Sequence, residues 1–564
     1  MGLHSRRSSA IPIGRGGRHS RRRSPRHRFR GPGPRLLATL SCVALATTVT
    51  TGSTWALLSD GAAGGPEQLA SGALTPAPSA AATANNGCSG TNQRTNVGVS
   101  WTDSQSTTAD ASGGSLVTGY NVTRAPTSGG AYSAAGSVTG SPSPTTYSDA
   151  PTVANTPVAL VANTANQAFP LSERTLTAGA ALTIGTASNE VNAVQTSPDG
   201  LTVVIAEYAA SQIQILTWSG TAWAIAKTLT APNPTAVAIS PVPNASGFYM
   251  AYVVSDPGTT TNGAVYPVTL NGGSSVLGTA IAAQRQANPT AIAITPNGSE
   301  VYVTNYNSGT VSAIATATAS VSTVALPGTT PHPVALATTF DSSHVYVADR
   351  TNSFIDDIAV ATNAVGSHVT LASGGLNDSI LTTSGNPNLL AMVPDGLSLY
   401  VAEFGTAEIQ VVNTALATAP DTIAATISTG GGSAPIDLAA SPNGCLIYVA
   451  DWPSNNIFSI NTTTNAESLA FTTKCWTQDP QAMQVTPDNQ YLVIPENYRC
   501  GDIQVLNTAT NAVTTITGVG TAPTMVAIPP VPIWYETTAT HTLWNSNPST
   551  PTMYSAGWNP GGWQ

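Results

Sequence analysis

The stretch VYVTNYNSGTVSAI, residues 301–314, has the pattern of two short β-strands joined by a polar turn. Apolar side chains alternate at Val301 and Val303 and again at Val311 and Ala313, and turn-forming residues separate the two runs. Related segments follow at residues 345–358 (VYVADRTNSFIDDI), 399–412 (LYVAEFGTAEIQVV) and 447–460 (IYVADWPSNNIFSI). A hairpin that recurs along one chain indicates a repeat architecture.

Each hairpin belongs to a larger unit, which reads as a short apolar strand, a turn such as SPDG, a second strand, a polar loop and two further strands. Successive turns lie 43 to 55 residues apart. Four-stranded units of this length cannot bury both faces alone, and radial stacking into a β-propeller buries them. We predict an all-β fold with seven blades in residues 175–530. The first strands begin near Asn192, Pro234, Pro289, Pro333, Pro387, Pro435 and Pro480.

Two segments are left over at the ends of this repeat. PTMVAIPP (523–530) looks like an additional first strand, and LTAGAALTIG (176–185) looks like an isolated last strand. They could close the ring by pairing the chain ends, or together start an eighth blade. We expect seven blades, with eight as the alternative.

The repeat resembles the YVTN family of β-propellers, which is common in secreted and surface-layer proteins of prokaryotes. Tyr302-Val303-Thr304-Asn305 is the motif itself, and the likeness spans about residues 186–528. The resemblance implies a propeller in an exported protein.

The charge distribution separates the N-terminus from the rest of the chain. Eleven of the 19 basic residues lie between Arg6 and Arg35, and all 28 acidic residues lie at Asp60 or later. Without the N-terminus, eight basic and 28 acidic residues leave a net charge of −20. We expect no nucleic-acid partner, because phosphate neutralisation requires clustered Lys and Arg.

Residues 1–58 have the features of an export signal, followed by a linker at 59–87. The arginine-rich start precedes LLATLSCVALATTV (36–49), which is too short for a confident membrane span. Residues 50–74 resemble the region after the apolar segment of camelysin-type proteins, which are exported to bacterial surfaces and biofilm matrices. We expect a secreted or cell-surface protein of a prokaryote, with no stable membrane span after processing.

Residues 88–174 resemble a fibronectin type III module. Val97, Val99 and Trp101 alternate as a strand, and GYNVTRAPTSGGAY (119–132) is the most specific segment. PVALVANTA (157–165) departs from the pattern, because the usual tyrosine of the penultimate strand is missing. We expect a spacer module, and a Trp- and Pro-rich tail at 531–564 that packs on the propeller or extends from it.

The residue that ends each second strand is acidic or an amide, and an aromatic residue often comes next. The seven strand ends are Glu207, Asp256, Asn305, Asp349, Glu403, Asp451 and Glu496. The following residues are Tyr208, Pro257, Tyr306, Arg350, Phe404, Trp452 and Tyr498. Carboxylates at such positions accept hydrogen bonds from backbone N–H groups of the next turn. Alternatively, they form with the rings a shallow recognition face for an extracellular glycan, a cell-wall polymer or a surface protein.

Catalytic patterns are weak. His332, His344, His368 and His541 fall at unlike positions of the repeat, so we expect no metal, no cofactor and no catalytic residues. We predict a non-enzymatic binding or structural protein. The alternative is an exported propeller enzyme, a lactonase-like hydrolase or an oxidoreductase, with its site at the channel mouth.

Four cysteines follow the export segment, in a compartment where disulfides persist. The repeat places Cys475 and Cys500 in neighbouring loops on one face, whereas Cys445 follows a turn on the other face and Cys88 precedes the propeller. We predict a Cys475–Cys500 disulfide that leaves Cys445 outside it.

Overall fold

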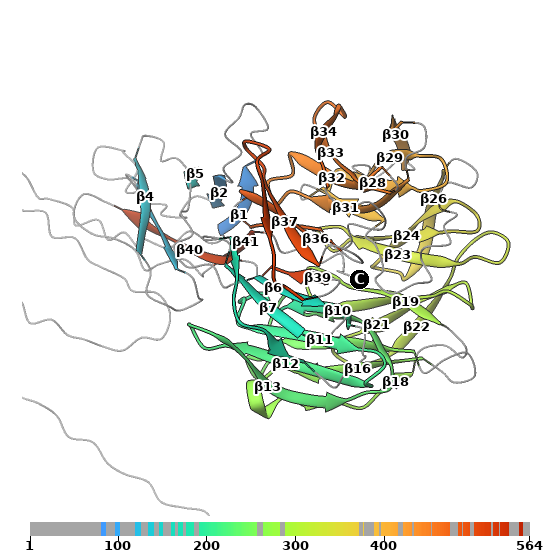
Figure 1. Ribbon diagram of the computed structural model, residues 1–564, viewed down its shortest axis with the longest axis horizontal. Helices are drawn as coiled ribbons and strands as arrows, with labels where there is room; N and C mark the ends of the chain where they lie inside the picture. Colours follow the sequence, from blue (N-terminus) through green and yellow to red (C-terminus); the bar gives the residue numbers. More distant parts are fainter. Residues whose placement is uncertain are drawn as a thin grey trace, which may run out of the picture. The chain divides into compact units, whose positions relative to one another are not determined.

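The computed structural model describes the propeller and the strands of two smaller sheets (Figure 1). Its described propeller residues are 159–163, 167–172, 176–184, 191–256, 263–282, 288–371, 376, 389–393, 396–414, 421–430, 434–452, 454–473, 483–487, 489–496, 501–520 and 523–528. Within these ranges the chain is all-β, apart from one 3-10 turn at Gly272–Ser274. The predicted all-β class is confirmed for these residues.

The first blade shows the unit that the repeat predicts. Its antiparallel strands are hydrogen-bonded in chain order, β10 (Val191–Thr196), β11 (Thr202–Glu207), β12 (Gln212–Trp218) and β13 (Trp223–Thr230). In β11 five successive residues are buried, because a neighbouring blade covers each face. A strand buried on both faces reads as a continuous apolar run, which explains TVVIA in the sequence.

Six further sheets repeat this order along the chain. The second contains β14 (Pro234–Ile239), β15 (Met250–Ser255) and β16 (Ala264–Thr269), with β17 (Val276–Leu277) and β18 (Ile281–Ala282) on its outer edge. The third contains β19 (Pro289–Ile294), β20 (Glu300–Asn305), β21 (Thr310–Ala315) and β22 (Val321–Ala325), and the fourth β23 (Pro333–Thr338), β24 (His344–Asp349), β25 (Phe354–Ala359) and β26 (Ala364–Thr370).

The fifth to seventh blades complete this series. The fifth contains β27 (Leu390–Met392), β28 (Ser398–Glu403), β29 (Glu408–Asn413) and β30 (Thr422–Ser428). The sixth contains β31 (Pro435–Ala440), β32 (Leu446–Asp451), β33 (Asn456–Asn461) and β34 (Glu467–Thr472), and the seventh β35 (Gln484–Val485), β36 (Tyr491–Glu496), β37 (Asp502–Asn507) and β38 (Val513–Ile516).

An eighth blade closes the ring, so the expectation of seven blades is wrong. Its inner strand is β39 (Pro523–Ala527) from the C-terminal side. It pairs with β6 (Ala159–Asn163), which is followed by β7 (Gln167–Ser172), and β7 pairs with β8 (Thr177–Ala178) and β9 (Leu182–Thr183). β39 lies against β10 of blade one and β36 of blade seven. β6 and β7, whose residues the sequence assigned to the fibronectin-like module, therefore form the middle of this blade.

The recurring hairpin supplies the two middle strands of each blade. Val301 and Val303 of β20 pack toward blade two, whereas Tyr302 packs toward blade four. Gly309 in the following turn has a φ of 64°, and an added Cβ would lie 2.9 Å from the carbonyl oxygen of Pro331. The turn therefore requires glycine at this position.

Proline at the start of the first strands also has a physical reason. Pro234, Pro289, Pro333, Pro435 and Pro523 each pair with the last residue of the adjoining strand, and a register shift follows directly. A residue at the first position of a strand next to a bulge has no ladder hydrogen bond to donate. The missing N–H of proline therefore removes no hydrogen bond at this position.

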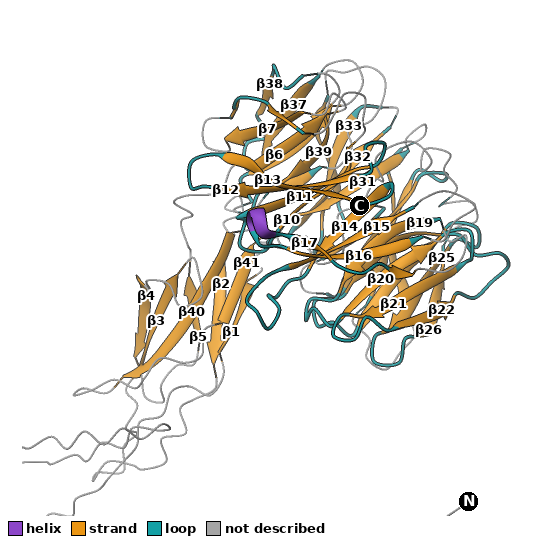
Figure 2. Cartoon of the chain, turned by 90° about the horizontal axis from the view of Figure 1, so that it is seen from below, coloured by secondary structure: helices purple, strands orange, loops and turns teal. Residues whose placement is uncertain are grey.

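Two smaller sheets combine both ends of the chain. One has the order β1-β2-β5, formed by β1 (Ala80–Asn85), β2 (Asn96–Trp101) and β5 (Thr146–Asp149). The other has the order β4-β3-β40-β41, formed by β4 (Ser133–Thr139), β3 (Gly119–Ala125), β40 (Val531–Thr540) and β41 (Thr552–Ala556). β40 runs antiparallel alongside β3 (Figure 2). The start of the Trp- and Pro-rich tail is thus a strand partner of the N-terminal region.

Several predictions concern residues outside the described ranges. They are the export signal at 1–58, Pro257, Tyr498, His541, Cys475 and Cys500. Cys445, in the turn between β31 and β32, is disulfide-bonded. The Cys475–Cys500 pairing stays a prediction. In the part of the chain that the structure describes, no helix has the length and apolarity needed to cross a membrane.

Candidate functional site

The predicted strand-end residues occupy one position in six blades. Glu207, Asn305, Asp349, Glu403, Asp451 and Glu496 are the last residues of β11, β20, β24, β28, β32 and β36. In blade two the matching residue is Ser255, which pairs with Pro234 at the end of β15, and Asp256 follows it. The prediction was therefore one residue too far along in that blade.

These side chains do not form an exposed face. Glu496 is 4% exposed, and the other five acidic or amide strand ends are 0% exposed. The six side chains are buried in the structure, and the prediction that strand-end side chains contact a ligand stays a prediction. The physical reason for the burial lies in what covers and binds them.

Asp349 and Asp451 accept hydrogen bonds that hold two loops together. Oδ1 of Asp349 accepts from the N–H of His332 at 2.9 Å and from that of Thr351 at 3.1 Å. Oδ1 of Asp451 accepts from the N–H of Ala434 at 2.6 Å. His332 and Ala434 directly precede the first-strand prolines of their blades. The carboxylates therefore bind the chain that enters each blade to the turn after its second strand.

The third strands contribute polar partners that the sequence analysis missed. Asn305 Nδ2 donates to Ser312 Oγ at 2.9 Å, and Gln504 Nε2 donates to Glu496 Oε1 at 2.5 Å. A buried polar residue stands third in five of these strands, at Gln214, Ser312, Asp356, Gln410 and Gln504. A single polar residue at a fixed place in an apolar strand was the available signal.

Two buried carboxyl groups lack hydrogen-bond partners among the described residues. They are Glu207 in β11 and Asp356 in β25. Burial raises the pKa of Glu207, and the nearby Gln214 side chain opposes part of this rise. Burial, and secondly the negative charge of Asp349, raises the pKa of Asp356 to about 8. Asp356 is therefore mostly protonated at pH 7.

The aromatic residues of the predicted face are only half-buried, and those of neighbouring blades come together. The rings of Phe404 on blade five and Trp452 on blade six are stacked, with centroids 5.9 Å apart and an interplanar angle of 20°. The ring of Tyr306 on blade three lies 4.5 Å from that of His332, which leads into blade four. We call Tyr306, His332, Phe404 and Trp452 the aromatic arc.

The remaining predicted residues differ in their relation to the arc. Arg350 follows β24 on blade four, between the two ring pairs in blade order, and is half-buried. Its N–H donates to the carbonyl oxygen of His332 at 3.0 Å. Tyr208 has the same half-buried position on blade one, which blade two separates from the arc.

The other histidines have local partners. His344 Nδ1 lies 2.7 Å from Asp357 Oδ1, and the His368 ring is stacked on Phe354 at 4.3 Å. Within the described ranges, no group of three or more His, Cys, Asp or Glu side chains has a geometry that could hold a metal ion. Asp437 is the one charged residue in the described inner strands, and its Oδ2 accepts from the N–H of Met483 at 2.7 Å.

Comparison with known proteins supports the fold alone. No protein-family model and no curated protein matches the sequence. Among solved structures, dihydro-heme d1 dehydrogenase NirN is similar with a TM-score of 0.50 and 13% identity, over 65% of this chain and 74% of that one.

Two further structures have lower scores. A candidate 6-phosphogluconolactonase from Bacteroides uniformis has a TM-score of 0.44 and 19% identity, over 58% of this chain and 98% of that one. Streptogramin B lyase has a TM-score of 0.41 and 15% identity, over 56% of this chain and 92% of that one. The chain thus contains an eight-bladed β-propeller.

Proposed function

We propose that this is an extracellular binding protein whose propeller recognises its ligand through the aromatic arc. The observation that carries this proposal is the arrangement of half-buried rings on neighbouring blades, with Phe404 stacked on Trp452 and Tyr306 beside His332. Partly exposed rings offer an apolar surface that packs against sugar faces or peptide side chains. A glycan or cell-wall polymer is the ligand class that we favour, with a surface protein as the other candidate.

The buried network beneath the arc suits a rigid recognition surface. Asp349 fixes the turn that carries Arg350, because its carboxylate binds backbone N–H groups of both adjoining loops. Asp451 fixes the turn that carries Trp452, because it accepts from the N–H of Ala434 and from the Ser454 hydroxyl. A surface that is ordered before binding loses less conformational entropy when the ligand arrives. The acidic strand ends then contribute to recognition by positioning the rings.

Extracellular location is part of the proposal. The arginine-rich start, the apolar run at 36–49 and the net charge of −20 that remains without them support export. The resemblance to YVTN-type propellers, given above on Tyr302 to Asn305, points in the same direction.

An enzyme is the second candidate, and the inner strands do not favour it. The charged group in their described residues, Asp437, already accepts the Met483 N–H. A hydrolase or oxidoreductase site would need several converging acid, base or cation side chains. The activities of the similar solved structures do not transfer at 13–19% identity.

We also propose that the two smaller sheets form one fibronectin type III-like sandwich, into which the propeller is inserted. Sheets of three and four strands match the seven strands of such a module. The five N-terminal strands come first and the tail supplies β40 and β41, next to β3. The tail strand contains Tyr535, which offers a tyrosine for the penultimate strand that PVALVANTA lacks.

The arc predicts a specific binding defect. Replacing Phe404 and Trp452 with Ala should weaken polymer binding at least tenfold, because central aromatic contacts often contribute more than 1 kcal/mol each. Binding is measured by co-sedimentation with purified peptidoglycan and by affinity electrophoresis in gels that contain soluble polysaccharides. Circular dichroism establishes that the variant remains folded.

Two control variants sharpen this test. Tyr208→Ala removes a ring at the same loop position of blade one and should leave binding unchanged. Trp452→Leu keeps apolar packing but removes the ring, so it should weaken binding with less effect on stability. Equal binding by the double variant would place the site elsewhere, and a wild-type protein that binds none of these polymers would contradict the glycan proposal.

A further inference from the structure

Second-strand tyrosines connect neighbouring blades through side-chain hydrogen bonds. The hydroxyl of Tyr400 on blade five donates to Asn465 Oδ1 on blade six at 2.6 Å. The hydroxyl of Tyr302 on blade three lies 2.6 Å from Asn363 Oδ1 on blade four. Both asparagines lie in the turn between the third and fourth strands, with φ values of 54° and 51°. We call this contact the tyrosine latch.

The boundary between blades four and five has an acidic version of the latch. Tyr346 stands third in β24, as Tyr302 and Tyr400 do in β20 and β28. Its hydroxyl is hydrogen-bonded to Asp421, which directly precedes the fourth strand of blade five. An asparagine amide does not titrate, whereas a carboxyl group does. At the boundary between blades three and four, the Tyr302 hydroxyl also lies 2.6 Å from Oε2 of Glu300, a carboxyl group of its own strand. The boundary between blades four and five differs because there the carboxyl group comes from the neighbouring blade and replaces the asparagine.

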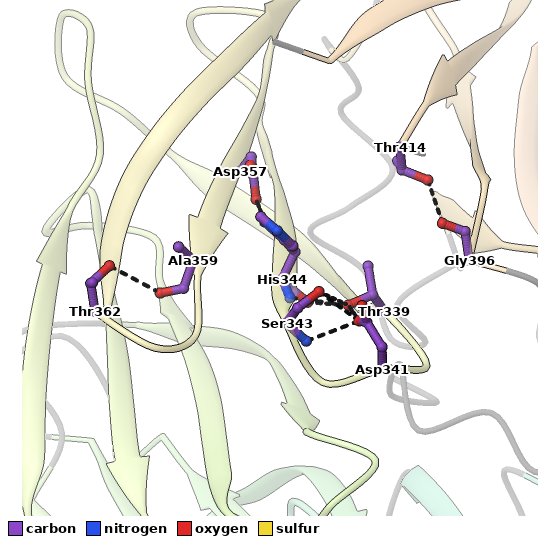
Figure 3. Close-up of polar contacts among 9 residues, drawn as sticks. All are labelled: Thr339, Asp341, Ser343, His344, Asp357, Ala359, Thr362, Gly396 and Thr414. Carbon is purple, nitrogen blue, oxygen red and sulfur yellow. Dashed lines mark hydrogen bonds and ion pairs between the residues drawn. The ribbon is translucent and has the colours of Figure 1, made fainter. Parts of the chain in front are cut away.

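Blade four contributes further charged groups near Tyr346, and Figure 3 shows three of them, His344, Asp357 and Asp341. Asp357 is opposite Tyr346 in the strand register, and its Oδ1 lies 2.7 Å from His344 Nδ1. Asp341 lies in the adjoining turn, where Ser343 and Thr339 donate hydrogen bonds to it. Asp421 Oδ2 is buried and has no hydrogen-bond partner in the described part of the chain. The His344 side chain thus lies near three carboxyl groups, those of Asp357, Asp341 and Asp421.

We propose that Tyr346, Asp421, Asp357 and His344 form a pH-sensitive latch, which holds blades four and five together more tightly as the medium becomes acidic. Protonation of Asp421 removes a half-buried charge and its repulsion by Asp357. The hydrogen bond to Tyr346 survives, because a protonated carboxyl group still accepts through one oxygen.

The direction of the pH dependence follows from the linkage between proton binding and folding. Burial, and secondly Asp357, raises the pKa of Asp421 to about 6, whereas Tyr346 and His344 oppose the rise. A folded-state pKa above the unfolded value of 3.8 means that the folded state binds a proton more tightly. The stabilising contribution is complete below about pH 4 and is lost as the pH rises through 6. Asp421 is half-exposed, so solvent screening reduces its size.

The decisive experiment compares thermal unfolding of two proteins between pH 4.5 and 8. Both carry Asp356→Asn, so that the buried carboxyl of blade four titrates in neither, and one also carries Asp421→Asn. The Asp421→Asn protein should unfold a few degrees higher at pH 7.5, and this difference should vanish near pH 4.5. A difference that is equal at all pH values, or no difference at all, would overturn the latch.

The reciprocal variant tests the same idea at an asparagine latch. Asn465→Asp in the Asp356→Asn background introduces a carboxyl group beside Tyr400 on the next boundary. It should lower the unfolding temperature at pH 7.5 more than at pH 4.5. A shift in unfolding temperature that is independent of pH would show that this position has only a packing role.

Discussion

Truncation after residue 522 is expected to open the propeller, whereas truncation after residue 530 is expected to leave it closed. The first removes β39, the inner strand of blade eight, which pairs with β6 and contacts β10 and β36. The second retains β39 and removes the strands that pair with the N-terminal region. The two proteins differ by only eight residues at the truncation point.

The size of the expected effect follows from burial. Met525, Val526, Ala527 and Ile528 are all 5% exposed or less, in the cores that blade eight shares with blades one and seven. The N–H of Ile528 also donates to Gln484 Oε1 at 2.8 Å. Burying three large apolar side chains stabilises by roughly 5–9 kcal/mol, which is comparable to the whole stability of a typical domain.

Thermal unfolding followed by circular dichroism and the elution volume in size-exclusion chromatography distinguish the two proteins. The 522 truncation should lose its cooperative transition or unfold at least 15 °C lower, with an expanded elution volume. The 530 truncation should keep the propeller transition within a few degrees. Its residues 80–149 should become more sensitive to protease, because β3 has lost its partner β40. A cooperative, unshifted transition after truncation at 522 would show that β39 does not close the ring.

The sequence predicted seven of the eight blades for a clear reason. Those seven have all four strands in chain order, so a turn such as SPDG recurs between first and second strands. In blade eight the inner strand is the last of the propeller and its partner β6 is the first, so no turn joins them. PVALVANTA then looked like part of the module before it, although its residues 159–163 form β6 of the propeller.

The candidate site was predicted in position but not in environment. The strand-end rule found Asp349 and Asp451, and the local hydrogen-bonding interpretation of such carboxylates is the one that applies. Their complete burial depends on the chain that enters each blade and donates its N–H, which lies 17 residues before each carboxylate. The ring pairs, Phe404 with Trp452 and Tyr306 with His332, likewise depend on which loops meet between blades.

Asp356 is the buried group whose replacement should stabilise the fold most. It is 0% exposed in β25, opposite Val347, and its face of the blade packs with Val345 and Ile358 against blade three. Neither oxygen has a hydrogen-bond partner among the described residues, and burial raises its pKa to about 8. Since the unfolded value is 3.8, the stabilising contribution of the bound proton is complete below about pH 4 and is lost as the pH rises through 8.

The wild-type protein is therefore expected to lose up to about 1.4 kcal/mol of unfolding free energy per pH unit between pH 4 and pH 8 through Asp356. Asp356→Asn should abolish this loss. The variant should differ little from wild type near pH 4.5 and be most stabilised, relative to it, at pH 8 and above. Urea unfolding at several pH values measures this difference.

Asp349→Asn, seven residues earlier, is the matched control. Its carboxylate already accepts from His332, Thr351 and Asn352, so an amide there should destabilise by roughly 1–3 kcal/mol. If Asp356→Asn also destabilised at pH 8, the carboxyl would have a partner that stabilises its charge, and the site would be a second anchor like Asp349.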